Sequence, residues 1–344
     1  MPPTQEDFWL GGFMLSLATA SLATWYVLIG RMRRGPILAY EPRRPVPWGG
    51  AAALLAVCFV AIAILATVFS GGGGRSKEPE ADVPRNAVRD IALSMAEQGV
   101  LVGAMLVVVV VVSGATKFDL GLPEYVDGLV RDIKIGIVAW LAALVPVYGM
   151  QLALVALLGE PSQHPLIKMV AQDQDGSILL AAFFAAVLFA PICEETTFRL
   201  LLQGWLEKWE DAKLGWRAAM ESTAAVATDG LPVVAEGATM GVAAPMDGNP
   251  TLPTALALAD VAPIHGLFGL PHGWVPILVS SLLFALAHFG IGPDPIPLFL
   301  LALVLGYVYQ RTHRIVPCMV THALFNSLTL IALWRMLSTG EPLP

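Results

Sequence analysis

The feature that most constrains this chain is a series of apolar runs, each long enough to cross a lipid bilayer. A transmembrane helix needs about 20 mostly apolar residues, and several runs here meet that requirement. Charged residues make up only 14% of the chain, whereas a soluble domain carries about a quarter. We therefore predict an all-α fold, a polytopic membrane helix bundle, in which the lipid-facing surface is apolar.

Reading the apolar runs in order predicts about eight transmembrane helices. They cover residues 8–30, 48–69, 91–113, 135–158, 177–207, 274–291, 296–310 and 315–337. This pattern divides the chain into an N-terminal four-span membrane region with linkers, residues 1–158, and a C-terminal membrane domain, residues 177–337. The C-terminal domain contains a long insertion at residues 209–273.

The distribution of basic residues predicts the orientation of the bundle. The first connection contains Arg31, Arg33, Arg34, Arg43 and Arg44, and connections rich in Lys and Arg lie on the cytoplasmic side. Alternation from there places both termini on the outer side. No basic patch interleaved with aromatic residues is present, so we expect membrane lipids and no nucleic acid among the partners.

The insertion at residues 209–273 is the longest segment without a predicted span. Its first part, WEDAKLGWRAAMES, has the composition of a polar helix, and the rest is rich in Ala, Gly, Pro and Thr. A segment of this length is usually functional or disordered. His265 and His272 lie in it without the spacing of metal ligands, and we interpret them as loop histidines without a role.

The fifth predicted span carries charges that lipid would reject. Its segment EETTFR contains Glu194, Glu195 and Arg199 between two apolar stretches, and ionised groups inside membranes are costly and usually functional. On a helix Glu195 and Arg199 share a face, whereas Glu194 points about 100° away. One carboxylate is therefore neutralised in place, and the other is available for chemistry.

Two further spans carry polar groups that complement this carboxylate. The sixth contains His288, and the eighth contains His322 and Asn326, four residues apart on one helix face. A carboxylate facing imidazole and amide groups can bind and deprotonate a water and stabilise a developing oxyanion. The alternative for each residue is a structural hydrogen bond between helices, worth about 1 kcal/mol in a membrane.

Three short motifs in these spans resemble those of a known family. EETTFR, FALAH and HALFN are similar to the EExxxR, FxxxH and HxxxN motifs of the CAAX-processing and bacteriocin-processing intramembrane proteases (the Rce1-like or ABI family). The resemblance covers residues 177–337 and implies an eight-helix type of bundle. In that family the catalytic cavity opens towards the cytosol and the bilayer. The insertion at 209–273 departs from the shorter connection that family members usually have.

The resemblance implies a role for each polar residue of the fifth and sixth spans. Glu194 resembles the general base that activates water, and Glu195 with Arg199 resembles its supporting pair. His288 resembles a catalytic partner of the base. The C-terminal domain would then be catalytic, with its site facing the cytoplasmic side.

The eighth span supplies the remaining residues of the implied site. His322 and Asn326 resemble the pair that binds the oxyanion. The family has also been described as metalloproteases, and Glu194, His288 and His322 could form a zinc site with an open position. The resemblance nevertheless favours a glutamate mechanism without a cofactor, since no HExxH motif is present.

The sequence therefore predicts an intramembrane endopeptidase. Its substrate would be a lipidated, CAAX-type protein or another membrane-anchored protein, cleaved by glutamate-activated water. Two alternatives remain open at this point: a non-catalytic membrane scaffold or immunity protein of the same fold, and a transporter or proton relay. Inverted repeats with interrupted helices are typical of many transporters, and no repeat is visible here.

Overall fold

A computed structural model describes residues 5–69, 87–158, 176–215, 266–289 and 295–339. Within these ranges every regular element is a helix, which confirms the predicted all-α fold. The first half contributes α1 (Gln5–Met32), α2 (Gly50–Phe69), α3 (Ala87–Val107) with the π-helical segment η1 (Val108–Val112), and α4 (Val126–Leu158). Each of these helices coincides with an apolar run of the sequence.

The second half begins with one long helix of changing pitch. It runs through α6 (Gly176–Phe183), η2 (Phe184–Phe189), α7 (Ala190–Glu195), η3 (Thr196–Gln203) and α8 (Gly204–Leu214), where η2 and η3 are π-helical. The next described element is the short 3₁₀ turn η4 (Leu267–Gly269). It is followed by α11 (Trp274–Ala287), α12 (Pro295–Thr312) and α13 (Ile315–Thr339). Gly215, with a φ of 61°, ends α8 in the left-handed conformation that glycine favours.

The described helices make this a multi-pass integral membrane protein. Six of them are long and apolar enough to span a membrane: Gly11–Met32, Ala87–Val112, Val126–Leu158, Gly176–Leu214, Pro295–Thr312 and Ile315–Ala332. The other two predicted spans correspond to α2 and to α11, whose apolar helical parts are shorter. In α11 the predicted span to residue 291 stops early, because the helix ends at Ala287 and His288 forms its C-cap.

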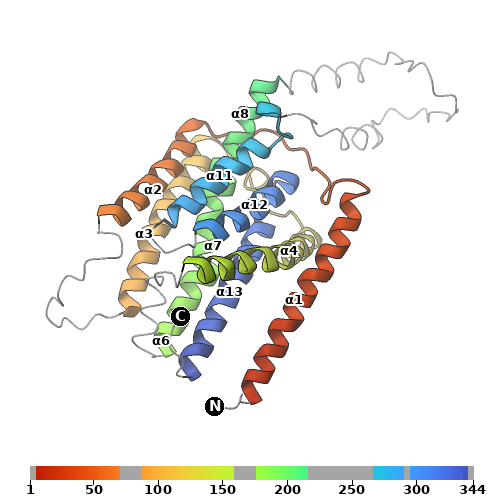
Figure 1. Cartoon of the computed structure of the whole chain (residues 1–344). Helices are drawn as coiled ribbons and strands as arrows, with labels where there is room; N and C mark the ends of the chain where they lie inside the picture. The colour runs from red at the N-terminus through yellow and green to blue at the C-terminus, as the bar shows by residue number, and fades with distance from the viewer. Residues whose placement is uncertain (1–4, 70–86, 159–175, 216–265, 290–294, 340–344) are drawn as a thin grey trace, which may run out of the picture.

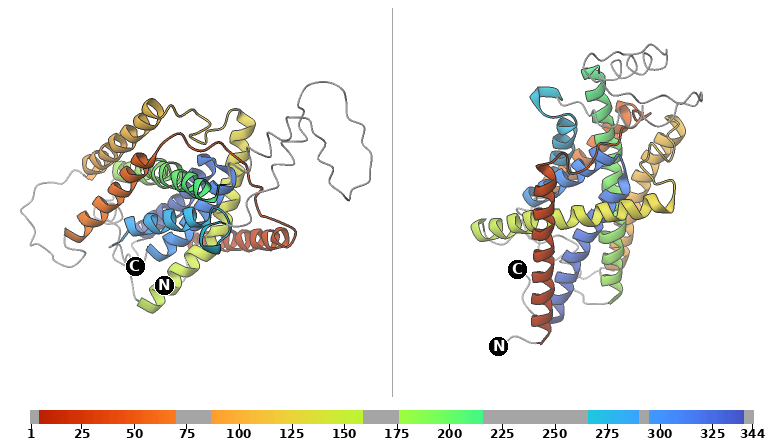
Figure 2. Two further views of the ribbon diagram at one scale, coloured as in Figure 1. Left: turned by 90° about the horizontal axis from the view of Figure 1, so that it is seen from above. Right: turned by 90° about the vertical axis from the view of Figure 1, so that its right-hand side faces the viewer.

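The helices pack around the C-terminal half of the chain. Helices α11, α12 and α13 lie against the long helix of α7, η3 and α8, while α1 lies at one side and packs on α4 (Figure 1). Helix α4 crosses α1 and α13 and does not run alongside them (Figure 1 and Figure 2). Hydrophobic periodicity gives no crossing angles, so this arrangement could not be predicted from the sequence.

The crossing of α4 and α13 depends on a glycine. A Cβ atom on Gly136 would lie 2.7 Å from Val320 Cβ and 2.8 Å from the Pro317 carbonyl oxygen. The Thr321 hydroxyl donates to the Gly136 carbonyl at 2.9 Å. Such close backbone approach at small residues is typical of helix packing in membranes, and here it fixes α13 at the residue just before His322.

Alternating spans place the first and third connections on the same side of the membrane, and the structure brings these two connections into contact. Arg44 of the first connection donates through Nε, at 2.7 Å, to Asp119 of the third connection, which lies between η1 and α4. The amide of Ile315, at the start of α13, donates to the Gly121 carbonyl of the third connection at 3.2 Å. The same end of the bundle also receives α8.

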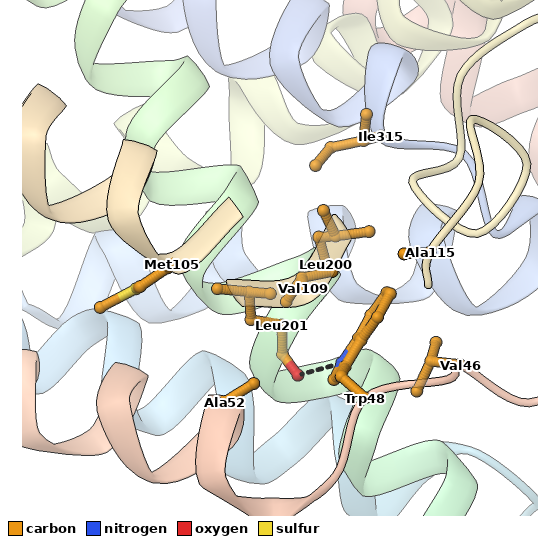
Figure 3. Packing of buried hydrophobic residues seen from close by; sticks show 9 residues of the cluster. All are labelled: Val46, Trp48, Ala52, Met105, Val109, Ala115, Leu200, Leu201 and Ile315. Atoms are coloured by element: carbon orange, nitrogen blue, oxygen red, sulfur yellow. Dashed lines mark hydrogen bonds between the residues drawn. The ribbon is translucent and has the colours of Figure 1, made fainter. Parts of the chain in front are cut away.

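A tryptophan of the first connection packs against the long helix. Trp48 is fully buried, and its indole Nε1 donates to the Leu201 carbonyl in η3 at 3.2 Å (Figure 3). The surrounding cluster contains Val46, Trp48, Ala52, Met105, Val109, Ala115, Leu200, Leu201 and Ile315. The N-terminal region is therefore joined to the C-terminal half through a shared core.

Candidate active site

A stripe of polar side chains runs along the long helix through the bundle. Glu195, Arg199, Gln203, Glu207 and Asp211 follow one another at intervals of four residues, and the first four are buried. In an α-helix each such interval drifts by about 40°. The π-helical segment η3 has more residues per turn and offsets part of this drift. The change of pitch thus keeps the stripe facing α11, α12 and α13.

Glu195 is held between a cation and an imidazole. Arg199 Nε donates to Glu195 Oε2 at 3.3 Å, and both side chains are fully buried. His322 Nδ1 donates to Glu195 Oε1 at 2.9 Å. Glu195 therefore has a partner on each oxygen, and it directs the other ring nitrogen of His322, Nε2, away from itself.

Glu194 lies where that second nitrogen points. Its Oε2 atom is 3.8 Å from His322 Nε2 and 3.9 Å from His288 Nε2, and this oxygen is buried without a hydrogen-bond partner among the described residues. His288 Nδ1 donates to the Phe284 carbonyl at 2.8 Å. Both imidazoles thus carry a proton on Nδ1 and turn Nε2 to the carboxylate. We name Glu194, His288 and His322 the Glu194 cluster.

The Glu194 cluster can bind and polarise a small hydrogen-bond donor. Three acceptor atoms converge here, and a water bound among them can donate to two of the three. The side chains of Glu194 and His288 are each 23% exposed, whereas that of His322 is 4% exposed. The Glu194 side chain is therefore partly exposed, although its Oε2 atom is buried, and Glu195 and Phe284, which contact the imidazoles, are fully buried.

The phenylalanine of the FALAH motif forms the floor of the site. Phe284 is fully buried, with ring centroids 4.9 Å from His288 and 5.8 Å from His322. The guanidinium of Arg199 lies 5.4 Å from the same ring centroid. One aromatic side chain thus contacts both imidazoles and the buried cation, which explains why the motif begins with an aromatic residue.

Asn326 is hydrogen-bonded to the backbone of another helix. Its Nδ2 donates to the Ala186 carbonyl in η2 at 2.7 Å, and the structure describes no hydrogen bond from Asn326 to His322 or Glu194. The structure therefore brings together five of the six predicted site residues by contacts. The pairing of Asn326 with His322 around an oxyanion stays a prediction.

The zinc alternative requires three ligands around one point. Among the described side chains, no group of three or more His, Cys, Asp and Glu residues is arranged to hold a metal ion. Glu194, His288 and His322 do not form such a group, so the zinc alternative stays a prediction, and we derive no step through a metal. The description of the family as metalloproteases gains no support from the described residues.

A second polar cluster, which the sequence analysis missed, surrounds Glu207 at the other end of the stripe. Glu207 accepts hydrogen bonds from Arg43 Nη2 at 2.9 Å and from Gln203 Nε2 at 3.0 Å, and it lies 3.3 Å from His313 Nε2. We name these four residues the Glu207 cluster. Arg43 also donates to the Tyr309 hydroxyl at 2.8 Å. The signal in the sequence was the four-residue repeat that begins at Glu195.

The described end of the long connection is fastened to α8. Glu210 accepts hydrogen bonds from the amides of Gly273 at 2.8 Å and Leu267 at 3.2 Å. His272, which we interpreted as a loop histidine without a role, is buried and bonded through Nε2 to Asp211 Oδ1 at 2.7 Å. Burial lowers the pKa of His272, but the Asp211 hydrogen bond and nearby carboxylates raise it above its usual value overall. His265 lies outside the described residues.

Fold and site together define a multi-pass membrane protein that buries a carboxylate–imidazole cluster between its helices. A model of the protein family described as Rce1-like, type II CAAX prenyl endopeptidase, matches residues 176–243 and 261–328. This match confirms the resemblance seen in the motifs, and it covers most of the described C-terminal part of the chain. No curated protein and no solved structure matches the chain.

The match also bears on the long connection. Its two segments include all six predicted site residues, and they extend over 209–243 and 261–273 of the predicted insertion. The interval between them is limited to residues 244–260. The N-terminal region, with α1 to α4, lies outside the matched residues.

Proposed function

We propose that this protein is a glutamate-dependent intramembrane endopeptidase acting on lipidated, CAAX-type or otherwise membrane-anchored proteins. One observation carries the proposal: Glu194 Oε2, without a hydrogen-bond partner among the described residues, faces Nε2 of both His288 and His322. A structural ion pair would bring such groups into contact. Here they stand apart at a distance that a water molecule can bridge.

The proposed reaction begins with proton transfer from water to Glu194. The water oxygen attacks the scissile carbonyl carbon, so that a C–O bond forms and the carbonyl oxygen becomes an oxyanion. His322 would stabilise this charge through Nε2–H when it is protonated, with Glu195 holding its Nδ1–H. Asn326 would contribute its free amide hydrogen if the substrate displaces it towards the site.

Collapse of the tetrahedral species completes the hydrolysis. The C–N bond breaks, and the leaving amine takes up the proton that Glu194 received from water. His288, 3.9 Å from Glu194, is placed to share that proton during the transfer. The products are a new carboxylic acid and a new amine, and the acid then loses its proton to the amine or to solvent, while the enzyme returns to its initial protonation state.

The placement of the site suits a membrane-anchored substrate. Glu194 and His322 lie on helices long and apolar enough to span a bilayer, and His288 caps the shorter apolar helix α11. A substrate held in the membrane by a lipid can therefore reach them without leaving it. The first connection, which contains five arginines, lies at the α8 end of the bundle. Under the rule that positive connections are cytoplasmic, the α8 end and the site access face the cytoplasm.

Cleavage by the purified protein tests this function. A quenched prenylated peptide and a panel of membrane-anchored peptides are compared between wild type, Glu194→Ala and His288→Ala, each with and without a chelator. We expect cleavage that both substitutions abolish and that the chelator leaves unchanged. Loss of activity with chelator would assign Glu194, His288 and His322 to a metal site. No cleavage of any peptide by a folded wild-type protein would favour the scaffold function.

A further inference from the structure

We propose that a chain of buried hydrogen bonds, ending on the first connection, positions the catalytic carboxylates. This polar chain runs from Arg199 through Ser280, Gln203 and Glu207 to Arg43. The proposal rests on the proposed function, because Arg199, the first member, holds Glu195. Since Arg43 lies outside the residues that match the family, the proposal makes the N-terminal region a part of the catalytic apparatus.

The link nearest the site runs through a serine of α11. Arg199 Nη1 donates to Ser280 Oγ at 3.2 Å, and the Ser280 hydroxyl is placed to donate to Gln203 Oε1 at 3.1 Å. All three side chains are fully buried. Arg199 Nη2 has no hydrogen-bond partner among the described residues. The guanidinium is therefore oriented by two bonds, one to Glu195 and one to Ser280.

The next link fixes the amide of Gln203. Its Nε2 group donates one hydrogen to Glu207 Oε1 at 3.0 Å and the other to the Gly306 carbonyl of α12 at 2.8 Å. Both amide hydrogens are thus used, and Oε1 is turned towards Ser280. A Cβ atom on Gly306 would lie 3.2 Å from Gln203 Oε1, so the glycine permits this close contact between helices.

The polar chain ends at Arg43, a cation of the first connection. Arg43 donates to Glu207 Oε2 at 2.9 Å and to the Tyr309 hydroxyl at 2.8 Å. The backbone beside it is tied down separately, because Lys208 Nζ donates to the carbonyls of Val46 and Trp48, each at 2.9 Å. The burial of Trp48 against η3 completes this attachment (Figure 3). Arg43 is therefore held by its neighbours as well as by its own bonds.

The direction of the donors supports a positioning role. With the Ser280 hydroxyl hydrogen on Gln203 Oε1 rather than on its other acceptor, the Ile277 carbonyl at 3.2 Å, each group from Arg199 donates to the next until the series ends on the carboxylate of Glu207. Hydrogen bonds aligned in one direction polarise one another in a low-dielectric interior. An arginine cannot release its proton at ordinary pH, so the chain orients Glu195 and does not conduct protons to it.

Two adjacent serines provide a matched test. Ser280 and Ser281 are both fully buried on α11, but Ser281 Oγ has no hydrogen-bond partner among the described residues. We expect Ser280→Ala to lower kcat by about fivefold to twentyfold with KM unchanged, and Ser280→Thr to recover most of it. Ser281→Ala should stay within about twofold of wild type, as expected for a residue outside the chain. The proposal would be overturned by equal losses of kcat in Ser280→Ala and Ser281→Ala, or by a change in KM with kcat unchanged.

Two adjacent arginines test the far end. Arg43 belongs to the chain, whereas Arg44 pairs with Asp119 in the third connection. Arg43→Gln should lower kcat by about threefold to tenfold, while Arg44→Gln should change it by less than about twofold. The double variant Ser280→Ala with Arg43→Gln should lose less than the product of the single losses, because both break the same chain. Full additivity would show that Arg43 does not act through Ser280.

A spectroscopic measurement separates this proposal from the proposed function. In protein labelled with ¹⁵N-histidine, the Nδ1 resonance of His322, assigned with His322→Gln, reports its hydrogen bond to Glu195. At one fixed pH, this resonance should shift in Ser280→Ala and Arg43→Gln but not in Ser281→Ala or Arg44→Gln. If the wild type cleaves no peptide and these shifts occur, the function fails and the polar chain stands. Unshifted resonances in all four variants would refute the chain, whatever the activity.

Discussion

The Glu194 cluster and the Glu207 cluster lie on the same helix and contain similar groups, yet their geometry differs. In each, a glutamate faces nitrogen atoms from other parts of the chain. Glu207 meets its partners at 2.9 to 3.3 Å. Glu194 meets the two imidazoles at 3.8 and 3.9 Å, and its Oε2 has no hydrogen-bond partner among the described residues.

This difference separates a structural cluster from a reactive one. Buried polar groups are normally satisfied, so a carboxylate oxygen that lacks a partner is a cost to stability that calls for another reason. Glu207 fits the normal pattern, since arginine, amide and imidazole groups surround it. Glu194 departs from that pattern at the place where the family motifs meet. The comparison predicts opposite responses of the two clusters to the same substitution.

The largest expected effect is on activity when Glu194 is replaced. Glu194→Gln keeps the shape of the side chain but removes the base, and general base catalysis contributes about 10² to 10⁴ in rate. We expect kcat to fall by about a thousandfold. The thermal unfolding midpoint in detergent should stay the same or rise, because a carboxylate without a partner is removed. A marked fall in the midpoint would show that Glu194 is structural.

The second effect is on stability when Glu207 is replaced. Glu207→Gln removes the charge that Arg43 faces, and breaking a buried ion pair in this way costs about 3 to 5 kcal/mol. We expect the midpoint to fall by several degrees, with activity per folded molecule reduced by no more than about tenfold. Glu124→Gln is the matched control, since its ion pair with Lys117, at 3.7 Å, is largely exposed. Similar midpoints for both variants would contradict the comparison.

The third effect concerns the crossing of α4 and α13 that places His322. Gly136→Ala puts a methyl group within 2.7 Å of Val320 Cβ, and such overpacking costs about 1 to 3 kcal/mol. We expect a lower unfolding midpoint and a reduced kcat, because α13 must move next to His322. Gly149→Ala in the same helix is the control, since a Cβ there meets nothing within 4 Å. A normal midpoint for Gly136→Ala would exclude a tight crossing.

The sequence was sufficient for those features that follow from short-range periodicity. Apolar runs gave the helices, and the four-residue spacing gave the contact between Glu195 and Arg199. The same spacing predicted that Glu194 faces other spans, and in the structure it faces His288 and His322. These predictions succeeded because lipid penalises any exposed charge and because helical spacing is regular.

Features that depend on contacts between distant segments could not be predicted. The Glu207 cluster joins the first connection, the long helix and the junction between α12 and α13, and its arginine and histidine lie outside the predicted spans. The contact between Glu195 and His322 required the register of two helices that are far apart in sequence. The transverse path of α4 depends on the Gly136 contact, and a glycine in an apolar run gives no sign of its partner. Asn326 illustrates the same limit, because its bond to η2 arises only from packing.

The smallest expected effect is a pH dependence at the α8 end of the bundle. The net shift of the His272 pKa is upward, because Asp211 and nearby carboxylates outweigh the effect of burial. A raised pKa in the folded state stabilises the protein below the pKa of the unfolded chain, about 6.5, and this contribution is lost as pH rises through the folded value. The unfolding midpoint of wild type, relative to that of His272→Gln, should therefore fall slightly as the pH rises above about 6.5. Asp211→Asn should remove most of the same dependence, because it takes away the nearest charge. A difference between wild type and His272→Gln that does not change with pH would mean that the pair acts through packing, and the α8 end would then be insensitive to protonation in this range.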